Sequence, residues 1–186
     1  LHFLPHSARD HRAAHPAYGF DHLQISDEPG CYRDAYWNWV REQDPSQLDG
    51  INVGLPPARA QWKRMMRFEG TVQPPEPREN WPRYFGANDH LTQAAFVADR
   101  SCRFIEERAG QPFFLWAGFY SPHSPWIAPK SCVDLYDIDA MPLPDRTDNE
   151  PWRGEAKGFS DRQLREIRAH YYAMVTDVDR AVGRVL

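Results

Sequence analysis

The residue of this sequence best placed to do chemistry is a histidine between two prolines, in the run Pro122-His123-Ser124-Pro125. It follows residues 113–120, an apolar run that is rich in aromatic side chains and has no charge. Such a run is typical of a parallel strand buried on both faces. Because open α/β sheets bind ligands beyond the carboxyl ends of their strands, His123 lies where such a sheet would carry its chemistry. A surface histidine in a proline-rich turn is the alternative.

Two helices are predicted to position this strand. The first has Asp89 as its expected N-cap and Gly110 as its stop, and the second begins with the capping box Ser160-Asp161-Arg162-Gln163. The apolar face of the first consists of Leu91, Ala94, Ala95, Ala98, Cys102 and Ile105. The stripe of the second consists of Leu164, Ile167, Tyr171, Met174, Val175, Val178, Val182 and Val185. A helix followed closely by a buried strand indicates a layered α/β domain.

The first half of the chain is expected to be less regular. Residues 18–25 suit another strand, and residues 34–42 suit a short amphipathic helix. Residues 49–88 are rich in proline and predict a loop excursion, with one possible helix at residues 59–68. A length of 186 residues fits a single domain.

Composition argues against several function classes. The chain has 22 Lys and Arg against 26 Asp and Glu, and the basic residues are dispersed, so no nucleic-acid partner is predicted. No apolar run approaches the roughly twenty residues of a membrane span, so we expect a soluble chain without a membrane partner, in the cytoplasm or the periplasm. The widely spaced Cys31, Cys102 and Cys132 predict free thiols rather than a disulfide scaffold.

Three segments, in order, resemble the sulfatase family of the alkaline-phosphatase-like superfamily. Residues 170–186, HYYAMVTDVDRAVGRVL, are similar at nearly every position to that family's Y-Y-A-x-V-x-x-V-D-x-x-V-G-R-V-L helix. Residues 111–136 resemble its apolar strand followed by P-H-x-P, P-K and D-L-Y. Leu1-His2-Phe3 and Tyr18-Gly19-Phe20-Asp21 resemble the end of its G-K-x-H segment and its G-F-D.

The resemblance implies that residues 1–186 are an internal portion of one sulfatase catalytic domain. The implied fold is α/β, part of an alkaline-phosphatase-like sandwich with a mostly parallel sheet flanked by helices. The implied function of the full-length protein is sulfuric ester hydrolysis, with a sulfate ester, or a phosphate ester, of a small molecule or carbohydrate as the partner.

By the same resemblance, His123 and His2 would be catalytic. Expelling an alkoxide from a sulfate ester requires donors where negative charge develops, and imidazolium groups supply them. Trp126, beside the P-H-x-P turn, is a candidate substrate-binding residue, and so are His11 and Arg12, which would line the substrate mouth.

The family's nucleophile and metal site have no counterpart in this sequence. The nucleophile is a formylglycine made within C-x-P-S-R or S-x-P-S-R, and none of the three cysteines begins such a motif. The calcium ligands include a D-N-G or D-H-G segment after the last helix, whereas Asp148-Asn149 precedes that helix and is followed by Glu150. We therefore predict no metal ligands in this chain. Calcium and formylglycine are expected in the full-length enzyme, and the chain alone is expected to be inactive.

Other interpretations stay open. A phosphodiester or phosphonate monoester hydrolase would share the fold and the histidines, and a non-catalytic binding module could derive from the same fold. The N-terminal histidines would suit zinc, but without a Cys partner or an H-E-x-x-H pattern a solvated loop is favoured. Asp177 and Asp179 are expected to be solvent-facing or structural. A partial sheet would expose strand edges, so self-association is expected.

Overall fold

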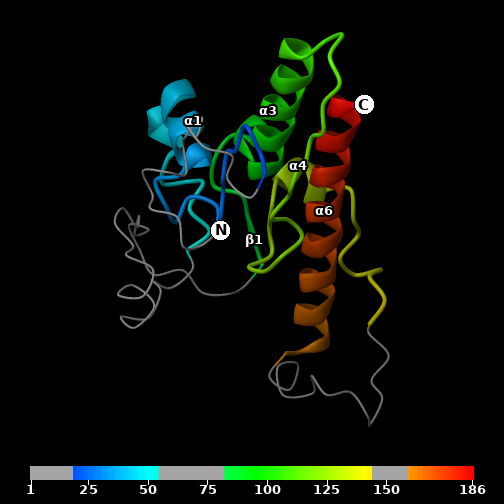
Figure 1. Ribbon diagram of the computed structural model, residues 1–186. Coiled ribbons are helices and arrows are strands. Elements are labelled where there is room, and N and C mark those ends of the chain that lie inside the picture. The colour runs from blue at the N-terminus through cyan, green and yellow to red at the C-terminus, as the bar shows by residue number, and fades with distance from the viewer. Residues whose placement is uncertain (1–18, 55–81, 144–158) are drawn as a thin grey trace.

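A computed structural model describes residues 19–54, 82–143 and 159–186 of the chain (Figure 1). The helices are α1 (Ala35–Gln43), α3 (Gln93–Glu107), α4 (Lys130–Val133) and α6 (Asp161–Val185), with the 3-10 turns η2 (Pro45–Gln47) and η3 (Asp89–Leu91). Strands β1 (Arg83–Tyr84) and β2 (Ile127–Ala128) pair in parallel, with Arg83 opposite Ile127. Helices packed beside a parallel strand pair confirm the predicted α/β class.

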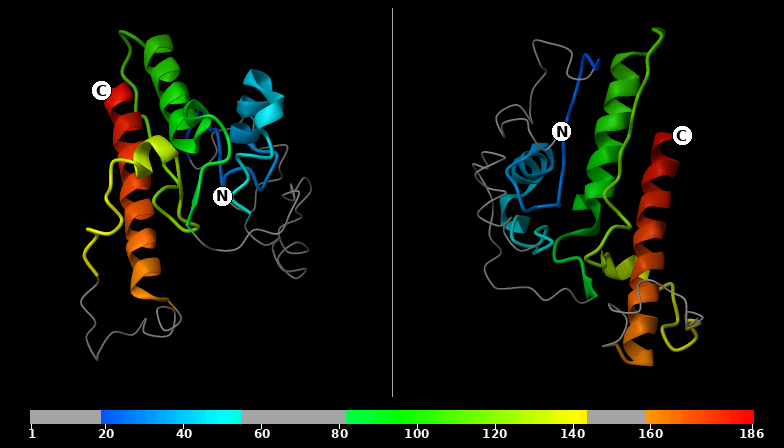
Figure 2. Two further views of the ribbon diagram at one scale, coloured as in Figure 1. Left: turned by 180° about the vertical axis from the view of Figure 1, so that it is seen from behind. Right: turned by 60° about the horizontal axis from the view of Figure 1, so that its bottom comes forward.

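Helix α6 runs alongside α3 in the same direction (Figures 1 and 2). The contact is made by small side chains, with Ala94 and Ala98 of α3 packed against Ala181 of α6. Ser160 caps α6 with the predicted capping box: its side chain accepts the Gln163 amide, and the Gln163 side chain accepts the Ser160 amide. Small residues at the crossing let the two backbones approach closely.

The apolar stripe predicted for α6 is only partly buried. Met174 is buried, whereas Tyr171, Val175 and Val182 are exposed. The other buried residues of the helix are Ala169, His170, Ala173 and Ala181. The prediction was too wide because the face that α3, α4 and β2 contact is narrow and is lined mainly by alanines.

Helix α3 begins later than predicted. Thr92, not Asp89, is its N-cap, because the Thr92 side chain accepts the Ala95 amide at 3.1 Å. Asp89 instead starts the 3-10 turn η3, and the extended backbone of Thr92 separates that turn from the helix. The predicted end is confirmed, since the helix finishes at Glu107 and Gly110 follows with a φ of +81°.

Helix α1 confirms the short helix predicted at residues 34–42. Its N-cap, Asp34, is fully buried and accepts the amides of Trp37 and Asp27, each at 3.0 Å. Tyr36 is also buried and donates its hydroxyl to the Leu91 carbonyl at 2.6 Å. The Tyr36 contact joins α1 to the turn η3 that precedes α3, and Tyr36 and Leu91 belong to the largest described core.

The strand predicted at residues 113–120 is an extended segment that enters no sheet ladder in the part of the chain that the structure describes. It is not buried on both faces, because Phe114 and Trp116 are 71% and 74% exposed. A strand is buried on both faces only inside a sheet that is covered by helices on both sides, and the described residues place no sheet around this segment. Residues 19–25 likewise contain no regular strand, only a single bridge at Phe20. The helix predicted at residues 59–68 lies outside the described residues.

The expectation of thiols rather than a disulfide scaffold is confirmed within the described ranges. Cys31, Cys102 and Cys132 form no disulfide, and Cys31 and Cys132 are buried. No helix that the structure describes is long and apolar enough to cross a membrane. The exposed apolar side chains of residues 113–116 suit self-association, which stays a prediction.

Asp177 of α6 is a structural residue, whereas Asp179 is exposed. The Asp177 carboxylate accepts a hydrogen bond from the side chain of Thr92 and so ties the N-cap of α3 to α6. Burial raises the pKa of Asp177 from 3.8 to about 6, while the Thr92 hydrogen bond and Arg180 act in the opposite direction. Between about pH 4 and pH 6, Asp177 of the folded protein therefore keeps a proton that the same residue of the unfolded chain has already released.

Because of this difference, the Asp177 contribution to stability is present below pH 4 and is lost as the pH rises to about 6. In the parent protein, the free energy of unfolding should fall by at most about 3 kcal/mol across this window because of Asp177. In Asp177→Asn this fall should be absent. Urea denaturation at pH 4, 5, 6 and 7 measures it. The exposed Asp179→Asn is the matched control. Equal pH slopes in the parent chain and Asp177→Asn would contradict the prediction.

Candidate functional site

The P-H-x-P turn is fixed at both ends. On the incoming side, the His123 amide donates to the Tyr120 carbonyl at 3.1 Å. On the outgoing side, the chain enters β2, where the Arg83 amide donates to the Trp126 carbonyl at 3.2 Å. The Ser121–Pro122 and Ser124–Pro125 peptide bonds are both cis. The histidine is thus presented from a short turn between an extended segment and the parallel strand pair.

The His123 side chain is exposed, with Nδ1 2.6 Å from the Ser124 carbonyl oxygen. A carbonyl oxygen can only accept, so Nδ1 carries a proton in this contact. Within the described residues Nε2 makes no hydrogen bond. The imidazole can therefore accept a proton at Nε2, or donate one when it is charged, toward a bound molecule.

Tyr120 lies directly against this imidazole, with ring centroids 5.0 Å apart. Its hydroxyl donates to the same Ser124 carbonyl at 2.8 Å, and its amide donates to Gln93 Oε1 at 3.2 Å. Burial raises the pKa of Tyr120 above its usual range, and the nearby carboxylates of Glu28 and Asp27 add to the shift. The phenol therefore remains a hydrogen-bond donor at any working pH.

Asp27 and Glu28 belong to a turn that sequence reasoning missed. Glu28 has a φ of +44° and accepts the Tyr32 hydroxyl at 2.6 Å. Burial raises the pKa of Tyr32, and the hydrogen bond to Glu28 adds to it. No periodicity marks such a turn, although the run Asp27-Glu28-Pro29-Gly30 is a turn signal that could have found it.

Trp126, the candidate substrate-binding residue of the turn, is partly buried and packs against a cluster formed by β2, α4 and α6. The cluster consists of Ala128, Cys132, Val133, Ala173 and Met174. A packing role is therefore shown, and contact with substrate stays a prediction. His2, His11 and Arg12 lie outside the described residues, and so does the Asp148-Asn149 pair.

The described residues contain no group of three or more His, Cys, Asp or Glu side chains able to hold a metal ion. Of the N-terminal histidines, only His22 is described, and it lies against Phe104 with ring centroids 6.1 Å apart. His22 also lines a cavity whose walls include Phe96 and Phe104, so its surroundings are largely apolar.

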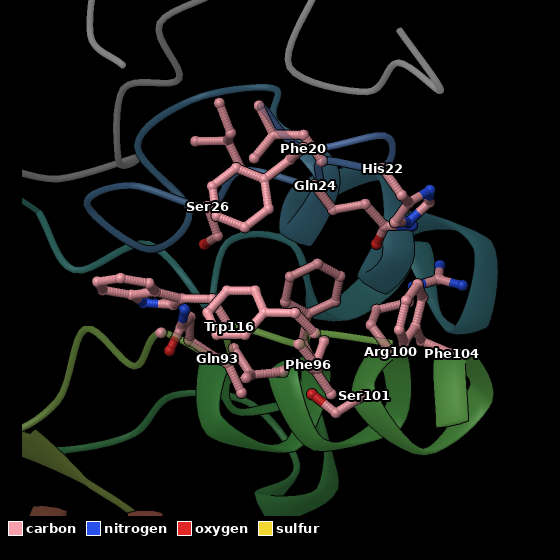
Figure 3. A pocket seen from close by; sticks show the side chains of 17 residues that line it. Phe20, His22, Gln24, Ser26, Gln93, Phe96, Arg100, Ser101, Phe104 and Trp116 are labelled. Atoms are coloured by element: carbon pink, nitrogen blue, oxygen red, sulfur yellow. The ribbon is translucent and has the colours of Figure 1, made fainter. Parts of the chain in front are cut away.

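A cavity of about 390 Å³ lies between residues 20–26, helix α3 and residues 114–118 (Figure 3). Aromatic rings from all three segments surround it: Phe20, Phe96, Phe104, Phe114 and Trp116. His123 and Trp126 are not among the described residues that line this cavity. Gln93 lines the cavity and also accepts the Tyr120 amide. One side chain therefore contacts both the cavity and the segment that leads into the P-H-x-P turn.

Comparison with known proteins gives a consistent result. The family model described as Sulfatase matches residues 16–186, which include the P-H-x-P turn and helix α6 but not Leu1-His2-Phe3. An arylsulfatase of Clostridium perfringens (strain 13 / Type A) is 28% identical over 165 residues, covering 82% of this chain and 30% of that protein. The multifunctional alkaline phosphatase superfamily protein PehA of Trinickia caryophylli is 25% identical over 119 residues, covering 51% of this chain and 23% of that protein.

A solved structure is also similar. The phosphonate monoester hydrolase SpPMH from Silicibacter pomeroyi matches with a TM-score of 0.57 and 25% sequence identity, over 90% of this chain and 34% of that chain. The chain thus spans about a third or less of the length of these relatives. Since the family model matches nearly the whole sequence, the chain belongs to the sulfatase family of the alkaline-phosphatase-like superfamily.

Proposed function

We propose that the full-length protein is a sulfuric ester hydrolase and that residues 1–186 are an internal portion of its catalytic domain. The observation that carries the proposal is the exposed His123 imidazole on the P-H-x-P turn, within the region that the sulfatase family model matches. Its Nδ1 proton is held by the Ser124 carbonyl, which leaves Nε2 available to a substrate.

In this proposal His123 acts at the sulfate group. A nucleophile of the full-length protein would bond to sulfur while the bond between sulfur and the ester oxygen breaks, and negative charge then develops on the leaving oxygen. A proton on Nε2 of the charged imidazole is donated to that oxygen, so that the leaving group departs as an alcohol and His123 becomes neutral. We propose the same kind of donor role for His2, and substrate contacts for Trp126, His11 and Arg12.

Calcium and formylglycine are part of the proposal only for the full-length protein. The residues that the structure describes do not fit a calcium site, because they bring together no set of three or more acidic or imidazole ligands. No cysteine of the sequence stands in C-x-P-S-R. The chemistry derived for this chain therefore involves its own histidines alone.

The test is a comparison of substrates with the full-length protein, after mass spectrometry has established whether formylglycine is present. We expect kcat/KM for an aryl sulfate to exceed that for the matched aryl phosphonate monoester and aryl phosphodiester by at least about tenfold, equivalent to about 1.4 kcal/mol of transition-state stabilisation. The reverse order would replace sulfate by phosphorus esters as the substrate class. No turnover of any of them by a folded, formylglycine-containing protein would favour a non-catalytic binding module.

A phosphonate monoester or phosphodiester hydrolase is the second candidate. It is favoured by the likeness of 90% of this chain to a phosphonate monoester hydrolase, at a TM-score of 0.57. An imidazole donor would serve either reaction, because a leaving oxygen develops negative charge in both.

A further inference from the structure

One carbonyl oxygen in the P-H-x-P turn accepts two hydrogen bonds. The Ser124 oxygen lies 2.6 Å from Nδ1 of His123 and 2.8 Å from the Tyr120 hydroxyl. A carbonyl has two lone pairs, so it can accept both donors at once. Tyr120 and His123 are therefore coupled through an atom of the main chain as well as by their ring contact.

The Tyr120 side of this arrangement is firmly anchored. The ring is partly buried, and its amide is held by Gln93, a buried side chain in the first turn of α3. The His123 side chain, in contrast, is exposed. The ring contact with Tyr120 does not distinguish the two ring nitrogens, so the hydrogen bond at Nδ1 must decide which nitrogen faces outward.

We propose that Tyr120 is a positioning residue for His123: its hydroxyl holds the Ser124 carbonyl in place as the acceptor that keeps the His123 proton on Nδ1 and presents Nε2 to the substrate. This inference rests on the proposed function only for what Nε2 then does. The hydrogen-bond arrangement itself stands on the described contacts and can be tested without any reaction.

The experiment uses the full-length protein labelled with ¹⁵N-histidine, with the His123 signals assigned from their loss in His123→Gln. At a pH where the imidazole is neutral, the ¹⁵N chemical shifts report which ring nitrogen carries the proton. We expect the Nδ1–H form to dominate in the parent protein. Without the Tyr120 hydroxyl the Ser124 carbonyl is no longer held toward Nδ1, so the Nδ1 hydrogen bond weakens by up to the worth of one ordinary hydrogen bond and the ratio of Nδ1–H to Nε2–H should fall by about 3- to 10-fold.

Tyr136→Phe is the matched control. Tyr136 makes an equivalent side-chain hydrogen bond, to Thr176 Oγ1 at 2.6 Å, and it lies next to Tyr172 rather than the P-H-x-P turn. Its removal should cost similar stability and leave the His123 tautomer ratio unchanged. If Tyr120→Phe does not fold, 3-fluorotyrosine at position 120 keeps the shape and changes the donor strength, which should also shift the ratio.

The two proposals fail in different ways. An unchanged tautomer ratio in a folded Tyr120→Phe protein overturns the positioning role, whatever the activity. A lowered ratio in Tyr120→Phe supports the positioning role even if the parent protein hydrolyses no ester, and that lack of activity overturns only the proposed function. Where the parent is active, Tyr120→Phe should lower kcat by about 3- to 10-fold with little change in KM, since the substrate still binds.

Discussion

Replacement of His123 by alanine is expected to lower kcat/KM of the full-length protein for an aryl sulfate by about 10²- to 10⁴-fold. The reason is that the leaving oxygen would lose its proton donor at the moment when it becomes charged. His123 is exposed, so the substitution removes little packing. The free energy of unfolding of the variant should therefore lie within about 0.5 kcal/mol of that of the parent. Steady-state kinetics and thermal denaturation of the same preparations measure both quantities.

His90→Ala is the control for this experiment. His90 is another exposed histidine, on the 3-10 turn η3, and it is not part of the P-H-x-P turn. It should retain full activity. The loss in His123→Ala should also shrink for a substrate with a good leaving group, because such a group departs without being protonated. A fully active His123→Ala protein would remove His123 from the catalytic assignment.

Gly30→Ala is expected to give the largest loss of stability of any single methyl addition considered for this chain. Gly30 has a φ of +76°, and an added Cβ would lie 2.6 Å from the Ile51 carbonyl oxygen and from the Cα atom of Asn52. These are backbone atoms, and Asn52 is itself fixed because its side chain is buried and bonded to the Gly30 carbonyl and the Gly54 amide. We expect a cost of at least about 3 kcal/mol, from the strained φ and the clash together.

Gly110→Ala separates the two contributions. Gly110 has a similar φ of +81°, but an added Cβ would meet nothing within 4 Å. Its cost should be that of the left-handed backbone alone, about 1–2 kcal/mol. Chemical denaturation of both variants and the parent gives the comparison. Equal losses in the two variants would show that the backbone at residues 51–52 yields, contrary to the expectation.

The elements that the sequence predicted well are those with a local signal. The capping box at Ser160 and the end of α3 near Gly110 depend on residues within one helical turn of each other, and both are confirmed. The N-cap of α3 was misplaced because Asp89 and Thr92 are both good caps, and only the extended backbone at Thr92 decides between them. Residues 113–120 have the composition of a buried strand, but burial depends on neighbours that composition does not reveal.

For the candidate site, the sequence supplied the histidine but not what holds it. The P-H-x-P pattern and the family resemblance both led to His123, because the residues that carry them are contiguous in the sequence. Gln93 could not be found in this way, because it meets the Tyr120 amide across 27 residues and sits on a helix face that otherwise looks like ordinary core. Asp27 and Glu28 approach Tyr120 from still farther along the chain, and long-range proximity leaves no local pattern.

The parallel packing of α3 and α6 has a consequence for the order in which the protein is made. Ala98 leaves the ribosome 83 residues before Ala181, against which it packs. At a synthesis rate of about 5–20 residues per second, the alanine face of α3 waits roughly 4 to 17 seconds for its partner helix. During that interval α1 is already available to cover the opposite, aromatic side of α3. We therefore expect the α1–α3 core to form first, with the α6-binding face of α3 uncovered until translation reaches α6.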